Sequence, residues 1–405
     1  MKSIARGLAL VCVLALHGCG SPKTHAVSLT MWLVGSESQA RTITALAAPF
    51  TKRTGVQVQC EAISWGEAHS KYLTAVAGGV EPDIGTMGLT WGVEFGQLGA
   101  LVDLRRSFPD ELSTIQQHTF SGLWDSVEHG GRAFGIPFDL ALQVLYYRTD
   151  LLPQPPQTWD ELVATLQRLG QEHRRMIIDW GNLSWIGYAP FLWQAGGDFY
   201  NEEKTTATLN SPQAIHALEF FRDLYARHDV PRTSLPVEQG LRTGEFPLVI
   251  SGNWKIISLT VGAPELKGQW TIGMLPKGPT GKRTAFLGGR MMGIFSRSTH
   301  RAEAWQFMQY LFEPSVQQQL YQAGLETQDA YLPPNIGSWD ALSMDPAMKA
   351  VLKQQAQEAK GPPAVSGWTE TTHLLEEAIQ RVILNGADPS AELAAANEAM
   401  NHVRQ

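Results

Sequence analysis

The sequence predicts an α/β protein of two domains, and three observations lead to this fold class. The chain has 405 residues, more than one hydrophobic core usually organises, so about two domains are expected. Hydrophobic residues make up 43% and charged residues 18%, a composition typical of an ordinary globular protein. Near the N-terminus, apolar runs with strand periodicity alternate with apolar stripes of helical periodicity.

This alternation begins with an apolar run at 29–34, which is suited to a buried strand. Apolar residues then recur at helical spacing over 43–50. An alternating segment at 56–62 indicates a second strand, a helical stretch covers 71–76, and 83–87 supplies a third strand. The order β-α-β-α-β predicts a parallel sheet with right-handed crossovers.

The loops that follow these three strands are candidate binding loops, because ligands of parallel sheets bind beyond the carboxyl ends of the strands. The first loop contains Ser36 and Glu37, the second contains Trp65, and the third contains Trp91 and Glu94. The alternative for each residue is a plain connecting loop.

The rest of the chain continues the mixed pattern. An apolar run at 144–147 predicts another strand. Helices are expected to begin near Thr158 and after a capping Ser211, to carry Trp305 on an apolar stripe, and to cover 374–382.

Residues 1–18 have the features of an export signal. Lys2 and Arg6 precede a short apolar run that ends in Leu16-His17-Gly18-Cys19, and this run is too short to span a membrane. The ending resembles a bacterial lipobox, so Cys19 is the expected lipid-bearing first residue of the mature chain, followed by a tether at 19–28. Ordinary signal cleavage after Ala26 is the alternative.

Charge and cysteine content exclude several partners. Removal of the signal changes the formal charge from −7 to −9, because it takes away two cations. The acidic balance disfavours nucleic acid and anionic lipid surfaces as ligands. Of the three cysteines, Cys12 lies in the signal and Cys19 is the expected lipidation site, so only Cys60 is left. Neither an internal disulfide nor a cysteine metal site can then form.

Motifs for catalysis and cofactor binding are absent from the sequence. G-x-S-x-G, H-E-x-x-H, C-x-x-C and G-x-G-x-x-G do not occur, and no histidines are paired at metal-ligand spacing. We therefore expect no enzyme activity, no cofactor and no metal. A glycan hydrolase needs only two carboxylates across a cleft, so that alternative stays open.

A series of short motifs occurs in order along nearly the whole mature chain. They are Gly79-Val80-Glu81-Pro82-Asp83-Ile84, 88–95, 99–104, Gly135-Ile136-Pro137-Phe138, 146–152, 156–162, Gly252-Asn253-Trp254, Gly288-Gly289-Arg290, Ala304-Trp305-Gln306-Phe307 and Gly367-Trp368. Each motif is weak alone, but the ordered series resembles the family 1 extracellular solute-binding proteins of carbohydrate ABC importers. The motifs between 135 and 162 are especially similar to maltodextrin-binding proteins.

The resemblance implies a two-lobe periplasmic-binding-protein fold with discontinuous lobes and a hinge. The expected N-terminal lobe is 29–138 with 286–328, and the expected C-terminal lobe is 139–285 with 329–405. It further implies that the lobes close around a sugar and deliver it to the transmembrane subunits of an ABC permease. We expect a monomer in the periplasm or on the outer face of the cytoplasmic membrane, with a lipid anchor as its only membrane contact.

The residues expected to hold the sugar combine flat aromatic surfaces with directional polar groups. A pyranose ring has an apolar C–H face, which suits an indole, and a rim of hydroxyls, which suits carboxylates and Arg. The expected set is Ser36, Glu37, Trp65, Trp91, Glu94, Asp139, Tyr188, Trp193, Trp254, Arg290 and Trp368, with Trp254 and Trp368 as stacking platforms. The alternatives are core packing for the aromatic residues and contact with water for the charged ones.

The identity of the sugar is suggested only by analogy. Similarity over 147–162 favours maltose, trehalose or a related gluco-oligosaccharide. A glycerol phosphodiester is an alternative ligand for the same transport role, and it would need more cations in the cleft than Arg290 alone.

Overall fold

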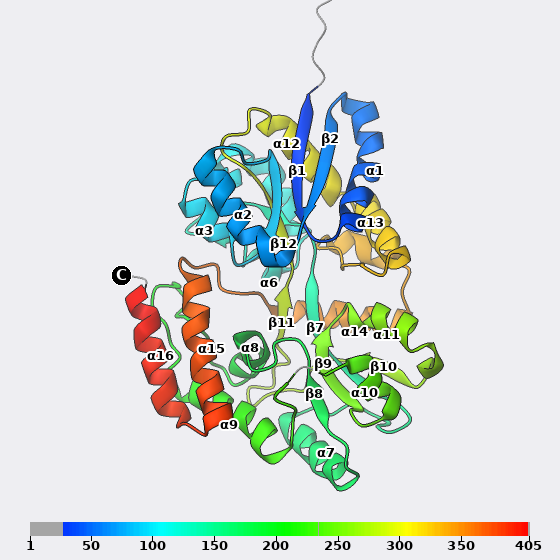
Figure 1. The fold of residues 1–405 in the computed structure, drawn as a ribbon, viewed down its shortest axis with the longest axis vertical. Coiled ribbons are helices and arrows are strands. Elements are labelled where there is room, and N and C mark those ends of the chain that lie inside the picture. Colours follow the sequence, from blue (N-terminus) through cyan, green and yellow to red (C-terminus); the bar gives the residue numbers. More distant parts are fainter. Residues whose placement is uncertain (1–26, 234, 404–405) are drawn as a thin grey trace, which may run out of the picture.

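The computed structural model describes residues 27–233 and 235–403 and shows two α/β lobes, one above the other in Figure 1. The expected signal peptide, Cys19 and most of the expected tether lie outside the described residues. Both lobes combine segments that are distant in the sequence. The α/β, two-lobe fold class predicted from the sequence is therefore confirmed.

The N-terminal lobe contains a five-stranded sheet in the order β2-β1-β3-β12-β6. The strands are β1 (Ser28–Val34), β2 (Gln57–Ile63), β3 (Ile84–Gly88), β6 (Ile136–Pro137) and β12 (Arg290–Ile294). β1 is parallel to β2 and β3, whereas β12 is antiparallel to both β3 and β6. The predicted β-α-β-α-β unit thus forms one part of the sheet, and a strand from far along the chain completes it.

Helices cover this sheet at positions that the local sequence explains. Ser36 caps α1 by accepting a hydrogen bond from the Gln39 N–H, and Gly55 ends the helix in the left-handed conformation that favours glycine. The helices of the lobe are α1 (Glu37–Thr54), α2 (Trp65–Gly78), α3 (Gly92–Gln97), α4 (Leu104–Ser107), α5 (Pro109–Gln117), α6 (Ser121–Trp124), α12 (Arg301–Phe312), α13 (Pro314–Glu326) and the 3₁₀ turn η2 (Ile336–Ala341). A small hairpin, β4 (Glu128–His129) with β5 (Arg132–Ala133), lies beside them.

The C-terminal lobe contains a second sheet in the order β13-β11-β7-β9-β8, with β10 paired to β7. The strands are β7 (Ala141–Arg148), β8 (Met176–Ile178), β9 (Leu248–Gly252), β10 (Trp270–Gly273), β11 (Ala285–Gly288) and β13 (Ala359–Lys360). β8 and β9 are parallel, so their carboxyl ends meet at one edge of the sheet.

Two helices of this lobe begin where the sequence predicts. Thr158 caps α7, and Ser211 caps α9 with Pro212 in its first turn. The helices are α7 (Trp159–Gln171), α8 (Trp185–Gln194), α9 (Pro212–Arg227), α10 (Val237–Thr243), α11 (Lys255–Gly262), η1 (Pro264–Leu266), α14 (Pro346–Gln357), α15 (Trp368–Asn385) and α16 (Pro389–Val403). Within the described ranges, no helix is both long and apolar enough to cross a membrane.

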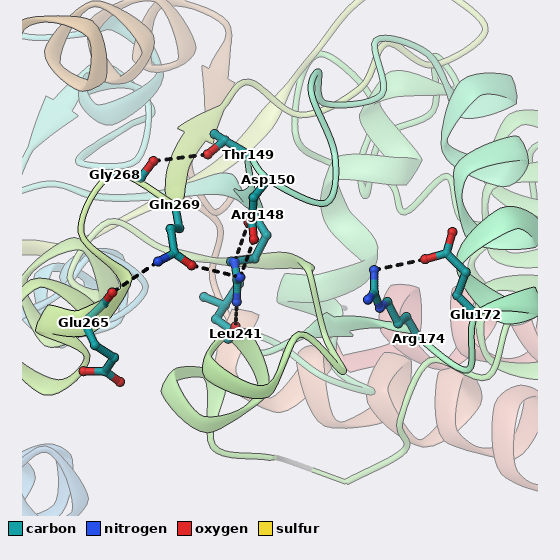
Figure 2. A network of polar contacts seen from close by, with 9 residues as sticks. All are labelled: Arg148, Thr149, Asp150, Glu172, Arg174, Leu241, Glu265, Gly268 and Gln269. Carbon is teal, nitrogen blue, oxygen red and sulfur yellow. Dashed lines mark hydrogen bonds and ion pairs between the residues drawn. The ribbon is translucent and has the colours of Figure 1, made fainter.

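Arg148 ends β7, and its polar contacts are shown in Figure 2. Its guanidinium donates to both carboxylate oxygens of Asp150 at 2.8 and 2.6 Å, to the Leu241 carbonyl at 2.6 Å and to Gln269 at 3.1 Å. This network ties β7 to α10 and to the residue that precedes β10. The motif Tyr146–Asp150 therefore has a structural role in the C-terminal lobe.

Two strand-to-strand passages join the lobes. β6 of one sheet leads into β7 of the other, and β11 leads into β12 through Gly289. Gly289 has φ +134°, and a Cβ there would lie closer than 3.0 Å to the Asp139 carbonyl oxygen. Only glycine fits this position without strain.

Residues 329–341 run beside the passages and contact the N-terminal lobe. Asp329 accepts a hydrogen bond from Ser36 at 2.5 Å, and Leu332 and Asn335 form backbone bridges to Leu140 and Thr119. The segment thus lies against the start of α1 and the region before α6.

Candidate functional site

A cleft lined largely by aromatic and aliphatic groups lies where the two lobes meet, and we call it the aromatic cleft. It contains about 970 Å³ of open space. The N-terminal lobe contributes Trp65, Gly88, Leu89 and Thr90; the C-terminal lobe contributes Trp180, Trp185, Ile186, Trp254 and Phe286; and Asp139, Ala141, Gly288, Gly289, Tyr331 and Pro362 complete the lining.

Four strands bring side chains to this cleft from their carboxyl ends. Trp65 follows β2, and Thr90 follows β3. In the other lobe, Trp180 follows β8 and Trp254 follows β9. Both walls therefore lie beyond carboxyl ends of strands, whereas Ser36 and Glu37, which follow β1, are not part of the lining.

Two tryptophans form the core of the C-terminal wall. The rings of Trp180 and Trp254 meet edge to face with centroids 4.7 Å apart, and Trp180 also meets Phe286 at 5.1 Å. The Trp254 ring lies against Gly252, where a Cβ would come closer than 3.0 Å to three ring carbons. Gly252 therefore allows the indole to adopt this position.

The N-terminal wall presents Trp65, which is 46% exposed. Its ring meets Trp91 edge to face at 5.9 Å, and Trp91 in turn meets His69 at 5.1 Å. His69 Nε2 lies 3.0 Å from Glu94 Oε2. Trp91, His69 and Glu94 thus support the exposed indole from behind.

Arg290 and Asp139 form a buried ion pair beside the cleft. Asp139 accepts hydrogen bonds from the Arg290 backbone N–H at 2.8 Å and from Nε at 2.6 Å, and it also pairs with Nη2. Arg290 further donates to the Val34 carbonyl and to Gln39, and its guanidinium lies 4.6 Å from the Tyr331 ring centroid. Burial raises the pKa of the Asp139 carboxyl, and the charge and hydrogen bonds of Arg290 oppose that rise.

Other residues expected at the site lie outside the cleft lining. Ser36 caps α1, and Glu37 is exposed in the first turn of that helix. Tyr188 is fully buried and donates to the Ala214 carbonyl at 2.7 Å, whereas Trp193 is 4% exposed and donates to Asp198.

Trp368 lies one ring behind the cleft wall. It is 2% exposed and meets Trp185 edge to face at 5.0 Å. Of the residues expected to bind sugar, the structure thus brings Trp65, Asp139 and Trp254 to the lining, with Trp91 and Trp368 directly behind it.

Sequence reasoning did not select four of the larger lining residues, which are Trp180, Trp185, Phe286 and Tyr331. Trp180 follows β8, whose three residues are too few for a periodic signal in the sequence. That Trp185, Phe286 and Tyr331 line the cleft follows only from the tertiary structure, which places both lobes side by side.

The cleft lining offers mainly apolar and neutral polar groups. Asp139 is the only charged residue of the lining, and it is already paired with Arg290. In the part of the chain that the structure describes, no group of three His, Cys, Asp or Glu side chains could hold a metal. Burial raises the pKa of the Cys60 thiol to about 12, so this cysteine is protonated and is a poor nucleophile at neutral pH.

Two α/β lobes around a shared cleft are the architecture of two-lobe binding proteins. Residues 45–350 match the family model described as bacterial extracellular solute-binding protein. The chain belongs to that family, and the family predicted from the ordered motifs is confirmed.

Similar proteins agree with this assignment. A Deinococcus radiodurans protein named as a probable ABC transporter-binding protein is 26% identical over 342 residues, which is 77% of each chain. The maltotriose-binding protein of Pyrococcus abyssi is 24% identical over 258 residues, covering 61% of this chain and 54% of that protein. The fold matches the solved structure of MalE, the sugar-binding protein of Xanthomonas citri, with a TM-score of 0.83, 23% identity, and coverage of 93% and 97% of the two chains.

Proposed function

We propose that the protein captures a neutral sugar, such as maltose, trehalose or a related gluco-oligosaccharide, and delivers it to the permease of an ABC importer. The names of the relatives support both parts, because one is named for an ABC transporter and another for maltotriose. The sugar is released unchanged.

The observation that carries the proposal is the wall formed by Trp180, Trp254 and Phe286, which faces Trp65 across the cleft. Indole rings provide large apolar area with few torsions to restrict, so they suit the C–H faces of pyranose rings. Sugar hydroxyls would find partners at the rim, where Thr90, Tyr331 and backbone groups of the two glycines at 288 and 289 lie.

The charges of the lining favour a neutral ligand over a glycerol phosphodiester. The lining contains no Lys, Arg or His, and the donors of Arg290 are directed to Asp139, Val34 and Gln39. A phosphate would enter this cleft without a free cation to pair with.

The same lining argues against a glycan hydrolase. Such an enzyme needs two carboxyl groups across the scissile bond, one of them free to exchange a proton. Asp139 is the only carboxylate of the lining and it is held by Arg290.

We propose that the lobes close by a hinge at the passages around Phe138–Ala141 and Gly288–Arg290. The expected boundaries at 286 and 329 are moved, because β11 lies in the C-terminal sheet and η2 packs on α13, so the lobes would be 29–138 with 289–341, and 139–288 with 342–405. Contacts of 329–341 with Ser36, Thr119 and Leu140 favour a third crossing after residue 341. We also propose that the signal at 1–18 directs export and that Cys19 carries a lipid. The protein would then be a monomer in the periplasm or on the outer face of the cytoplasmic membrane.

A titration of the purified protein with maltose, trehalose, maltotriose and glycerophosphocholine tests the ligand class. We expect saturable changes in tryptophan fluorescence with at least one neutral sugar, because Trp65, Trp180 and Trp254 line the cleft. Chromatography of the sugar after incubation should return it intact. Binding of the phosphodiester alone, or release of shorter sugars, would contradict the proposal.

A further inference from the structure

Residues 180–186 cover most of the loop after β8 and the first two residues of α8, and we call them the 180–186 segment. Trp180, Trp185 and Ile186 of this segment line the cleft. Its backbone is unusual, because Leu183 has φ +55° and Gly181 has φ +86°. Positive φ is uncommon for a residue such as leucine.

Three buried polar atoms around this segment have no hydrogen-bond partner among the described residues. They are Gln143 Oε1, Ser184 Oγ and Trp368 Nε1, and they make up half of the six such side-chain atoms in the described ranges. Buried polar groups in native proteins are nearly always paired. Their gathering around one segment indicates that its present arrangement is not the one with the best hydrogen bonding.

Gln143 holds the segment at both ends. Its Nε2 donates to the Trp180 carbonyl at 3.0 Å and approaches the Ile186 carbonyl at 3.5 Å. A flipped amide would direct Oε1 at these two carbonyl oxygens, so rotation of the side chain does not resolve the unpaired acceptor.

Ser184 stands directly before α8, where a serine side chain normally accepts a hydrogen bond from the first turn. Here Ser184 makes no such cap. Trp368 packs on Trp185 from behind, and its N–H is buried without an acceptor. A modest shift of the segment would change the surroundings of all three atoms together.

We propose that the 180–186 segment is a binding-linked switch with a second arrangement that the sugar favours. In that arrangement Ser184 caps α8 and Trp185 moves aside, so that the Gln143 carbonyl and the Trp368 N–H, which now lie behind the lining, become accessible to the hydroxyls of the ligand. The sugar shifts the population because only the second arrangement pairs these groups. The inference rests on the proposed sugar-binding function.

Trp368→Phe tests the switch, because it keeps a ring against Trp185 and removes the N–H. The smaller ring leaves a cavity that lowers the melting temperature of the free protein, and the loss of an unpaired buried donor offsets part of that fall. The Kd for the best-binding sugar should rise about tenfold, which corresponds to about 1.4 kcal/mol.

Trp305→Phe is the matched control. Trp305 Nε1 is also buried without a partner, but this residue lies in α12 and stacks on Phe108 at 4.8 Å, outside the cleft lining. We expect the same direction of change in melting temperature and an unchanged Kd. An equal rise in Kd for both variants would overturn the switch.

Ser184→Ala and hydrogen exchange give independent readouts. Loss of the capping hydroxyl should weaken sugar binding severalfold without lowering the melting temperature of the free protein. Sugar should also change amide exchange over 181–187 more than in α16. If the wild type binds sugar while Trp368→Phe and Ser184→Ala keep its affinity, the switch alone is refuted; if the wild type binds no neutral sugar, the proposed function fails as well.

Discussion

Gly252 determines where the Trp254 ring can lie. Its missing Cβ leaves the space that the indole occupies, because an added methyl group would come closer than 3.0 Å to three ring carbons. The position of an aromatic platform thus depends on a glycine two residues earlier, at the end of β9.

Gly252→Ala should therefore displace the Trp254 indole and raise the Kd for sugar at least about tenfold, about 1.4 kcal/mol of binding free energy. Isothermal titration measures the affinity, and circular dichroism checks that the fold is kept. Gly170→Ala is the control, because a methyl group there meets nothing within 4 Å in α7. Equal affinities for both variants and the wild type would show that Trp254 does not contribute to sugar binding.

A second residue-scale property concerns pH and lies far from the cleft. The hydrogen bond from Arg148 lowers the pKa of Asp150 below its usual value, which is about 3.9. A carboxyl whose pKa is lowered in the folded state stabilises that state above its unfolded pKa, and this stability is lost as pH falls through the lowered folded value.

Asp150→Asn should consequently reduce the free energy of unfolding at pH 7 by up to about 1 kcal/mol, a small effect because the Asp150 side chain is 42% exposed. The difference from the wild type should shrink at pH 3. Urea unfolding at the two pH values measures it, and sugar affinity should stay unchanged. A deficit that is as large at pH 3 as at pH 7 would exclude the ionised pair as its cause.

At the scale of elements, the sequence predicted the regular structure well where periodic segments are long. The strands β1, β2 and β3 and the helices α1, α9 and α12 follow directly from apolar spacing and capping residues. β8 has only three residues, Met176–Ile178, which is too short for a periodic signal. Trp180 was missed for that reason.

Pairings between distant elements were beyond the reach of local patterns. Asp139 and Arg290 were each expected to meet sugar, but they are 151 positions apart and the fold pairs them with each other. Every residue of α8 except Ile186 is buried, and Trp185 and Tyr188 are both below 9% exposure. A helix with apolar residues on every side gives no indication of which residue faces a cleft.

The passage between β11 and β12 provides an element-scale prediction. Gly289→Ala places a side chain at φ +134° and against the Asp139 carbonyl, so the backbone must strain or move. We expect a loss of about 1–3 kcal/mol in the free energy of unfolding. Denaturant titration measures it, with Gly170→Ala as the comparison. An alanine variant as stable as the wild type would show that the hinge does not require this glycine.

At the scale of the whole molecule, net charge and local charge lead to different expectations for ligand binding. The chain carries a formal charge of −7, so long-range electrostatics would oppose an anionic ligand and salt would weaken that opposition. The cleft itself offers a ligand no unpaired charge, because its single carboxylate is bound to Arg290. The binding of a neutral sugar would therefore involve no net electrostatic interaction that salt could screen.

The Kd for the sugar should consequently change less than about twofold between ionic strengths of about 0.01 M and about 1 M, over which the Debye length falls from about 30 Å to about 3 Å. Titration calorimetry at both salt concentrations measures this, and circular dichroism confirms that the protein stays folded. A fall in Kd with added salt would point to an anionic ligand that the negative chain repels. A marked rise would show that an unpaired charge of the protein holds the ligand, because aromatic contacts and neutral hydrogen bonds have no such dependence on salt.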